Sequence, residues 1–173
     1  MAPVRTFGHG TLEKAEIVDL LRGAGVEVVA DVRRYPGSRR HPHVARLEME
    51  AWLPEEGIDY VWLPRLGGRR RPDPDSPHVG LRNDQFRAYA DHMETDEFAE
   101  GVSELERLAA RSDVAVMCSE AVWWRCHRRL LADHLVLIEH EDVEHLFHDG
   151  RVEPHPPTPG VRVERSTLRY EPE

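Results

Sequence analysis

Most of the side chains that could do chemistry lie in thirteen consecutive residues near the middle of the chain, Met117 to Arg129. This segment, MCSEAVWWRCHRR, holds both cysteines together with a carboxylate, two tryptophans, a histidine and three arginines. Cys118 could be a nucleophile if nearby positive charge lowers its pKa, and Glu120 could be a general acid or base. A buried structural thiol and an arginine-paired glutamate are the alternatives, and the residue types alone leave both open.

Arginines are concentrated in three short segments of an otherwise acidic chain. Twelve of the 23 basic residues lie within 33–46, 65–71 and 125–129, whereas the formal net charge is −9. The overall charge argues against a general electrostatic coat for DNA. Arginine binds phosphate and carboxylate through a planar pair of donors, so these segments predict a local anion site if they converge.

Hydrophobic periodicity predicts how the segments are positioned. We expect strands near residues 4–7, 26–32, 58–63, 114–117 and 143–147, the last being the final strand. Between them we expect helices near 11–24, 44–53, 86–93, 98–109 and 126–136, with Thr11 as the first N-cap and Pro54 ending the second helix. This order predicts a three-layer α/β domain with a mostly parallel sheet of about five strands and helices on both faces.

In such a sheet, ligands bind at the edge where the carboxyl ends of strands meet helix N-termini. His9 follows the first predicted strand, Asp31 ends the second and Cys118 ends the fourth. We therefore expect these residues to lie at one edge, with His127 and Arg128 opening the next helix.

The chain is expected to form one α/β domain over residues 1–153, followed by a proline-rich tail, 154–173, that lies over the surface or is disordered. The loop 64–82 could be a lid or a flexible connection. No stretch approaches the roughly 20 apolar residues needed to span a bilayer, and the first residues have no hydrophobic signal region, so a cytoplasmic location is expected. In that compartment both cysteines are expected to be free thiols.

The histidines, the second cysteine and the tryptophans have several possible roles. A metal or haem site built on Cys118, Cys126 and His127 is an alternative, although the cysteine spacing differs from that of zinc sites and we expect no cofactor. Trp123 and Trp124 could stack on a base, or Trp124 could fill the core. Five further histidines are expected at the surface: His134, His140, His145, His148 and His155.

Five motifs, in this order, resemble a bacterial and archaeal family known as domain of unknown function 488: TFGHG, DVRRYPGSRR, LGGRR, FRAYADHM and MCSEAVWWRCHRR. The likeness covers about residues 5 to 157. It implies an α/β three-layer domain but no activity. Positions of the family signature are Gly8, His9, Asp31, Arg33, Pro36, Ser38, Arg39, Gly67, Gly68, Cys118, Glu120, Cys126, His127 and Arg128. The chain departs from the family in having Pro54 within a helix, and Trp123 where many relatives carry proline.

We therefore expect an enzyme of hydrolase or transferase type that acts on a small anionic substrate, with phosphate on a nucleotide or a nucleic-acid end as the main hypothesis. A non-catalytic nucleotide- or nucleic-acid-binding module is the other alternative. The expected catalytic residues are Glu120, His9 and Cys118. The expected substrate-binding residues are Asp31, Arg33, Arg34, Ser38, Arg39, Arg40, Gly67, Gly68, Trp123, His127 and Arg128.

Overall fold

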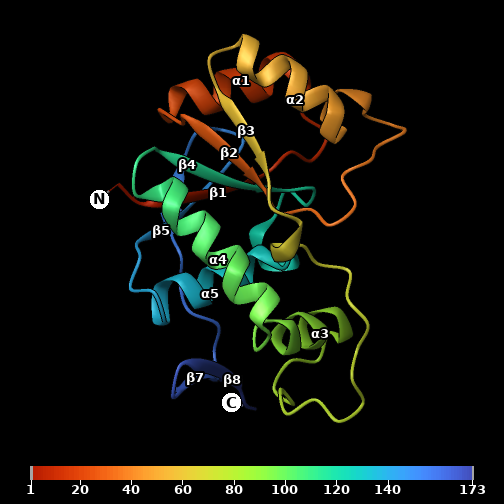
Figure 1. The fold of residues 1–173 in the computed structure, drawn as a ribbon, viewed down its shortest axis with the longest axis vertical. Helices are drawn as coiled ribbons and strands as arrows, with labels where there is room; N and C mark the ends of the chain where they lie inside the picture. Colours follow the sequence, from red (N-terminus) through yellow and green to blue (C-terminus); the bar gives the residue numbers. More distant parts are fainter. Residues whose placement is uncertain (1, 173) are drawn as a thin grey trace.

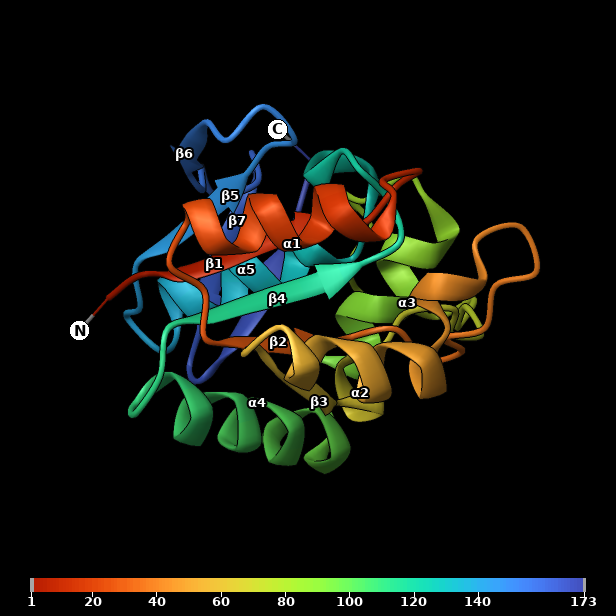
Figure 2. The same cartoon turned by 90° about the horizontal axis from the view of Figure 1, so that it is seen from above.

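Six strands form one sheet in the order β3-β2-β4-β1-β5-β6 (Figures 1 and 2). The computed structural model describes residues 2–172. All neighbouring strands run parallel except β6, which pairs antiparallel with β5. The strands are β1 (Val4–Gly8), β2 (Val28–Asp31), β3 (Asp59–Trp62), β4 (Val114–Cys118), β5 (Val143–Leu146) and β6 (Val152–Pro154).

Helices cover both faces of this sheet, as expected for the three-layer α/β class. In Figure 1, α1 (Lys14–Gly23) and α2 (Arg46–Glu55) lie above the sheet, and α3 (Asp84–His92), α4 (Asp96–Ala109) and α5 (Arg128–Leu137) lie below it. Successive side chains of a strand point to opposite faces. In β2, Val28 and Ala30 therefore join the cluster under α3, α4 and α5, whereas Val29 joins the cluster under α1 and α2.

Two expected helix boundaries were wrong, both for local reasons. The N-cap of α1 is Glu13 and not Thr11, because the backbone N–H of Glu13 donates to the carboxylate of Glu16 at 2.9 Å, as in a capping box. Helix α2 continues through Pro54 to Glu55. Proline removes only one helical hydrogen bond, and at this position it lies in the last turn.

The segment after β5 contains more regular structure than expected. Residues 143–147 are not the last strand, because β6 follows and β7 (Val161–Glu164) and β8 (Thr167–Tyr170) form an antiparallel hairpin. Leu168 and Tyr170 are buried in the core cluster beneath α3, α4 and α5. Figure 1 shows this hairpin at the opposite end of the molecule from α1 and α2. Its strands are short and half exposed, so their hydrophobic pattern is weak.

Within residues 2–172, none of the helices combines the length and the apolar character that crossing a membrane requires.

Candidate functional site

The three arginine-bearing segments meet around one cavity of about 340 Å³ at the carboxyl ends of β2 and β4. The walls come from the loop after β2, the loop after the short helix η2 (Pro64–Leu66), the start of α3, the loop after β4 and the residues around η3 (Trp123–Arg125). The lining residues are Arg33, Arg34, Tyr35, Gly68, Arg69, Asn83, Gln85, Phe86, Cys118, Ser119, Glu120, Arg125, Cys126 and His127.

Two glycines allow the loops of the site to approach one another. A Cβ at Gly8 would lie 1.7 Å from the carbonyl oxygen of Glu120, so the loop after β4 rests directly on the end of β1. A Cβ at Gly67 would lie 2.6 Å from the backbone nitrogen of Arg34. Because real Cβ atoms do not approach other atoms so closely, both contacts depend on the missing side chain.

The two cysteines form a close pair beside the cavity. The Sγ atoms of Cys118 and Cys126 lie 2.7 Å apart, and both residues are free thiols that are largely buried. Cys118 ends β4, and Cys126 immediately precedes His127, the N-cap of α5. The topology of strand, loop and helix N-terminus therefore places both cysteines at the wall of the cavity.

Arg128 is the nearest cation to this pair and is only 1% exposed. Its Nε donates to Cys118 Sγ at 2.9 Å, and its other nitrogens donate to the Thr6 hydroxyl at 3.1 Å and to the Glu120 carbonyl at 2.7 Å. Arg128 forms no ion pair with a carboxylate of residues 2–172. A buried guanidinium needs a compensating anion, and a thiolate in the cysteine pair is the group placed to supply it.

His127 favours the thiolate on Cys126. Its Nε2 lies 2.9 Å from the carbonyl oxygen of Val32, to which it donates, so Nδ1 faces Cys126 Sγ at 3.5 Å. Burial alone would raise the pKa of the Cys126 thiol, but the hydrogen bond with Cys118 and the charges of His127 and Arg128 lower it well below its usual value. Burial and the neighbouring Cys126 raise the pKa of Cys118 well above the ordinary thiol value. The pair therefore loses one proton readily and keeps the other.

Asp31 and Arg33 form a buried ion pair that shapes the wall of the cavity. Arg33 Nε and Nη2 donate to the two oxygens of Asp31 at 2.8 and 2.7 Å, and the Tyr60 hydroxyl donates to the same carboxylate. His9 Nε2 lies 3.2 Å from Arg33 Nη1, and burial lowers the pKa of His9 to about 4. His9 is therefore neutral at pH 7, and neither it nor Asp31 lines the cavity. These residues orient the loop after β2.

The structure brings together six of the predicted site residues and leaves eight outside the cavity wall. Cys118, Glu120, Arg33, Arg34, Gly68 and His127 line it, whereas His9, Asp31, Ser38, Arg39, Arg40, Gly67, Trp123 and Arg128 do not. Arg39 and Arg40 are exposed, and the Ser38 hydroxyl accepts the backbone N–H of His41. Eight lining residues were missed. Most of them lay in the motifs or arginine-bearing segments identified in the sequence: Tyr35, Arg69, Phe86, Ser119, Arg125 and Cys126. Asn83 and Gln85 lay outside these segments.

Both tryptophans lie differently from the expectation. Trp123 stacks on the ring of His145 with centroids 4.3 Å apart and planes 2° apart. Trp124 is 46% exposed, so the expectation that it fills the core was wrong. Neither ring lines the cavity, and the aromatic side chains that do so are Tyr35 and Phe86.

Three of the histidines expected at the surface are buried: His134, His145 and His155. His145 Nε2 lies 2.8 Å from His155 Nδ1, and His155 Nε2 lies 2.7 Å from the Asp133 carboxylate. The Tyr170 hydroxyl donates to the other oxygen of Asp133 at 2.8 Å. Because these partners come from distant parts of the chain, the periodicity around each histidine does not reveal its burial.

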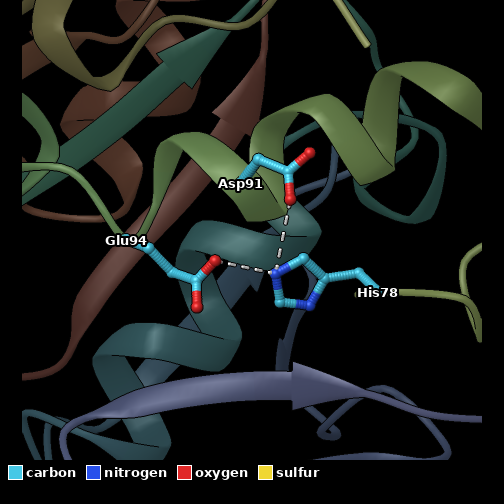
Figure 3. A group of neighbouring side chains, drawn as sticks. All are labelled: His78, Asp91 and Glu94. Carbon is cyan, nitrogen blue, oxygen red and sulfur yellow. Dashed lines mark hydrogen bonds and ion pairs between the residues drawn. The ribbon is translucent and has the colours of Figure 1, made fainter. Parts of the chain in front are cut away.

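A second group of polar side chains holds the 64–82 loop in place (Figure 3). His78 points toward the carboxylates of Asp91 and Glu94, and the ligand atoms of the three residues lie within 4.8 Å of one another. His78 Nδ1 accepts the backbone N–H of Tyr170 at 3.4 Å, so Nε2 carries the ring proton and donates to Glu94 at 3.3 Å. A metal ion would need the lone pair of Nε2. The group is therefore better suited to fastening the loop to α3 and β8 than to binding metal.

Comparisons with known proteins place the chain in a family. The search of curated proteins found no match. One similar solved structure is described as a candidate phosphatase (DUF442) from Shewanella putrefaciens CN-32. The two chains are 23% identical with a TM-score of 0.38, and the match covers 80% of this chain and 69% of that one. The family model described as "Domain of unknown function DUF488" matches residues 13–135. The match covers more than half of the sequence, and the protein therefore belongs to the DUF488 family.

Proposed function

We propose that the protein is an enzyme that acts on a small phosphate-bearing substrate and uses the Cys118–Cys126 pair as its nucleophile. The observation that carries this proposal is the thiol pair, with Arg128 at 2.9 Å, in the wall of a cavity rich in arginine. Arg128 and His127 stabilise a thiolate formed there, and they lower the pKa of Cys126 below the ordinary thiol value.

The charge of the cavity supports an anionic substrate. Four arginines line it, and of these only Arg33 forms an ion pair with a carboxylate of residues 2–172. Arg34, Arg69 and Arg125 keep their charge for a ligand, and Glu120 is the one carboxylate among the lining residues. Phosphate oxygens match the paired donors of such guanidinium groups.

The size and rim of the cavity support a nucleotide as the phosphate-bearing compound. Its volume of about 340 Å³ lies at the lower end of the range for small-molecule sites. Tyr35, 59% exposed, and Phe86 line it, and a planar base can stack on such rings. The guanidinium of Arg34 lies 5.3 Å from the centre of the Tyr35 ring, so the cavity offers a cation for phosphate close to a ring on which a base can stack.

The proposed reaction divides the work among three groups. The Cys126 thiolate attacks phosphorus, so an S–P bond forms while the bond from phosphorus to the leaving oxygen breaks. The free arginines stabilise the charge that develops on the phosphoryl oxygens. Glu120 gives a proton to the leaving oxygen, and then takes one from the water or alcohol that releases the phosphoryl group. Water gives hydrolysis, and an alcohol gives transfer.

A thermal-shift screen with nucleotides, sugar phosphates and short oligonucleotides tests the binding half of the proposal. A ligand at 100 times its Kd adds about 2.7 kcal/mol of stability, which raises the Tm of a chain of this size by roughly 5–10 °C. Arg125→Ala is expected to abolish the shift. Arg111→Ala, an exposed arginine in the turn before β4, is the matched control and is expected to keep it.

Phosphate release from the compounds that bind tests the catalytic half. Cys126→Ser is expected to keep the thermal shift and to lower turnover by at least about 100-fold, because a serine hydroxyl is not ionised there. Full turnover in Cys126→Ser contradicts the nucleophile. Binding without turnover in the wild type favours a non-catalytic nucleotide-binding module, and no shift with any phosphate compound contradicts the anion site.

A further inference from the structure

The thiol pair has the geometry for a second kind of chemistry. A disulfide bond is about 2.05 Å long, so the two Sγ atoms, 2.7 Å apart, need to move by less than 1 Å to become bonded. The cysteines end β4 and precede α5, and the loop between them includes η3. A loop can absorb so small a movement at less cost than packed helices or strands.

The two sulfurs are also chemically unequal. Cys126 faces His127 Nδ1 at 3.5 Å and is 7% exposed, whereas Cys118 is 2% exposed. The pair has one readily lost proton, so a thiolate lies next to a thiol. A reactive thiolate with a second thiol beside it is the arrangement of redox-sensitive cysteines, in which the second thiol resolves the oxidised first. Both cysteines line the cavity, so a small oxidant that enters it comes next to them.

We propose that Cys118 and Cys126 are a redox-active pair that closes to an intramolecular disulfide when a hydroperoxide enters the cavity. The Cys126 thiolate attacks a peroxide oxygen, so an S–O bond forms, the O–O bond breaks, and the departing oxygen takes a proton to become water or an alcohol. Cys118 then attacks the sulfur of the sulfenic acid. The S–S bond forms, the S–O bond breaks, and hydroxide leaves as water with the proton of Cys118. Two electrons pass from the two sulfurs to the peroxide.

Arg128 makes this disulfide reversible. In the reduced pair its buried guanidinium lies against Cys118 Sγ, and the Cys126 thiolate, 2.7 Å from that sulfur, is the negative charge next to it. A disulfide has no charge, so oxidation leaves Arg128 buried without an anion. The reduced form is stabilised relative to the oxidised form, which makes the disulfide easy to reduce by a dithiol. Closure also removes the nucleophile, and this regulatory consequence, unlike the disulfide itself, rests on the proposed function.

Intact-mass spectrometry of the full chain tests the pair without any substrate. Fully reduced protein is treated under argon with one to five equivalents of hydrogen peroxide, and samples are quenched with a maleimide. The expected product is 2 Da lighter than the reduced protein and no longer reacts with the maleimide at either cysteine. Its digest contains a peptide in which residues 118 and 126 are joined, and dithiothreitol restores both maleimide-reactive thiols. Overturning results are two free thiols after treatment, or products heavier by 16 or 32 Da with no species lighter by 2 Da.

Two variants test the order of the steps. With Cys118→Ser, the sulfenic acid on Cys126 is expected to persist and to be trapped by dimedone. With Cys126→Ser, the remaining thiol of Cys118 is expected to react at least about tenfold more slowly. Equal rates in the two variants, both shown by circular dichroism to be folded, overturn the assignment of Cys126 as the attacking sulfur.

The outcomes also separate this proposal from the proposed function. If the disulfide forms but no phosphate compound binds, the redox pair stands and the proposed function fails. If phosphate release is observed and peroxide changes neither it nor the mass of the protein, the proposed function stands and the redox pair fails.

Discussion

Gly8→Ala is the substitution for which the structure gives the sharpest expectation. Gly8 ends β1, and the loop that carries both cysteines lies directly on it. A Cβ there would lie 1.7 Å from the carbonyl oxygen of Glu120, 2.4 Å from its carbonyl carbon and 2.9 Å from Cα of Ala121. All three are backbone atoms, so no side-chain rotation relieves the overlap.

The cost follows from the distance the loop has to move. To reach ordinary van der Waals contact at 3.4 Å from the new methyl group, the Glu120 carbonyl must move by about 1.7 Å. That movement breaks the hydrogen bond from Arg128 to the Glu120 carbonyl, now 2.7 Å long. A bond from a charged donor contributes about 1.5–3 kcal/mol, and overpacking adds about 1–3 kcal/mol. We expect Gly8→Ala to lose roughly 3–6 kcal/mol, a large part of the 5–15 kcal/mol typical of a domain.

Urea unfolding measures this loss, and the rate of reaction with iodoacetamide measures the effect on the thiols. The Cys126 thiol is expected to react more slowly, because displacement of the loop separates it from its cationic neighbours. Gly23→Ala is the matched control: Gly23 lies at the end of α1, and a Cβ there has nothing within 4 Å. It is expected to be neutral or to gain up to about 1 kcal/mol. A Gly8→Ala protein within 0.5 kcal/mol of the wild type, with unchanged thiol reactivity, refutes the close contact.

Two further predictions concern the buried polar groups. Tyr170→Phe removes the hydroxyl that donates to Asp133 at 2.8 Å, and we expect it to lower the free energy of unfolding in urea by about 1.5–3 kcal/mol. Tyr35→Phe is the control: the residue is 59% exposed, so its urea midpoint is expected to stay unchanged. Equal midpoints for the two variants contradict the role of that bond. Burial lowers the pKa of His9 to about 4 and that of His145 to about 2. Below pH 6.5 the two histidines therefore take up protons when the protein unfolds, and the folded state loses stability as the pH falls. At pH 5 the expected loss is about 2 kcal/mol for each residue. A urea midpoint unchanged between pH 7.5 and 5 contradicts this linkage.

The fold class could be predicted because its signals are local. Buried strands are apolar runs, as in Val114–Cys118 and in Val28–Asp31 up to its final aspartate, and the order strand, helix, strand implies parallel pairing. The sequence could not reveal the hairpin near the C-terminus, since its strands have four residues each and one exposed face. The end of α2 was predicted wrongly at Pro54, because the cost of a proline depends on where in the helix it lies and Pro54 lies in the last turn.

The candidate site could be predicted only to the level of its segments. Convergence of the arginine loops follows from the topology, but the direction of each side chain does not. Arg39 is exposed and does not line the cavity although it lies in an arginine-rich loop, whereas Arg125 lines it. The sequence also did not show that Cys126 contacts Cys118, because that contact depends on the path of the intervening loop. For the same reason the sequence did not show that Arg128 is buried against Cys118 and does not line the cavity.

The position of β4 in the sheet bears on how the protein acquires its shape. Since β4 lies between β1 and β2, the first strand has no neighbour on that side until more than 100 further residues have been synthesised. Pairings of such long sequence separation form slowly. A nascent chain on the ribosome therefore exposes these edges of β1 and β2 until β4 has been synthesised, and Arg128 can reach the Thr6 hydroxyl of β1 only after that.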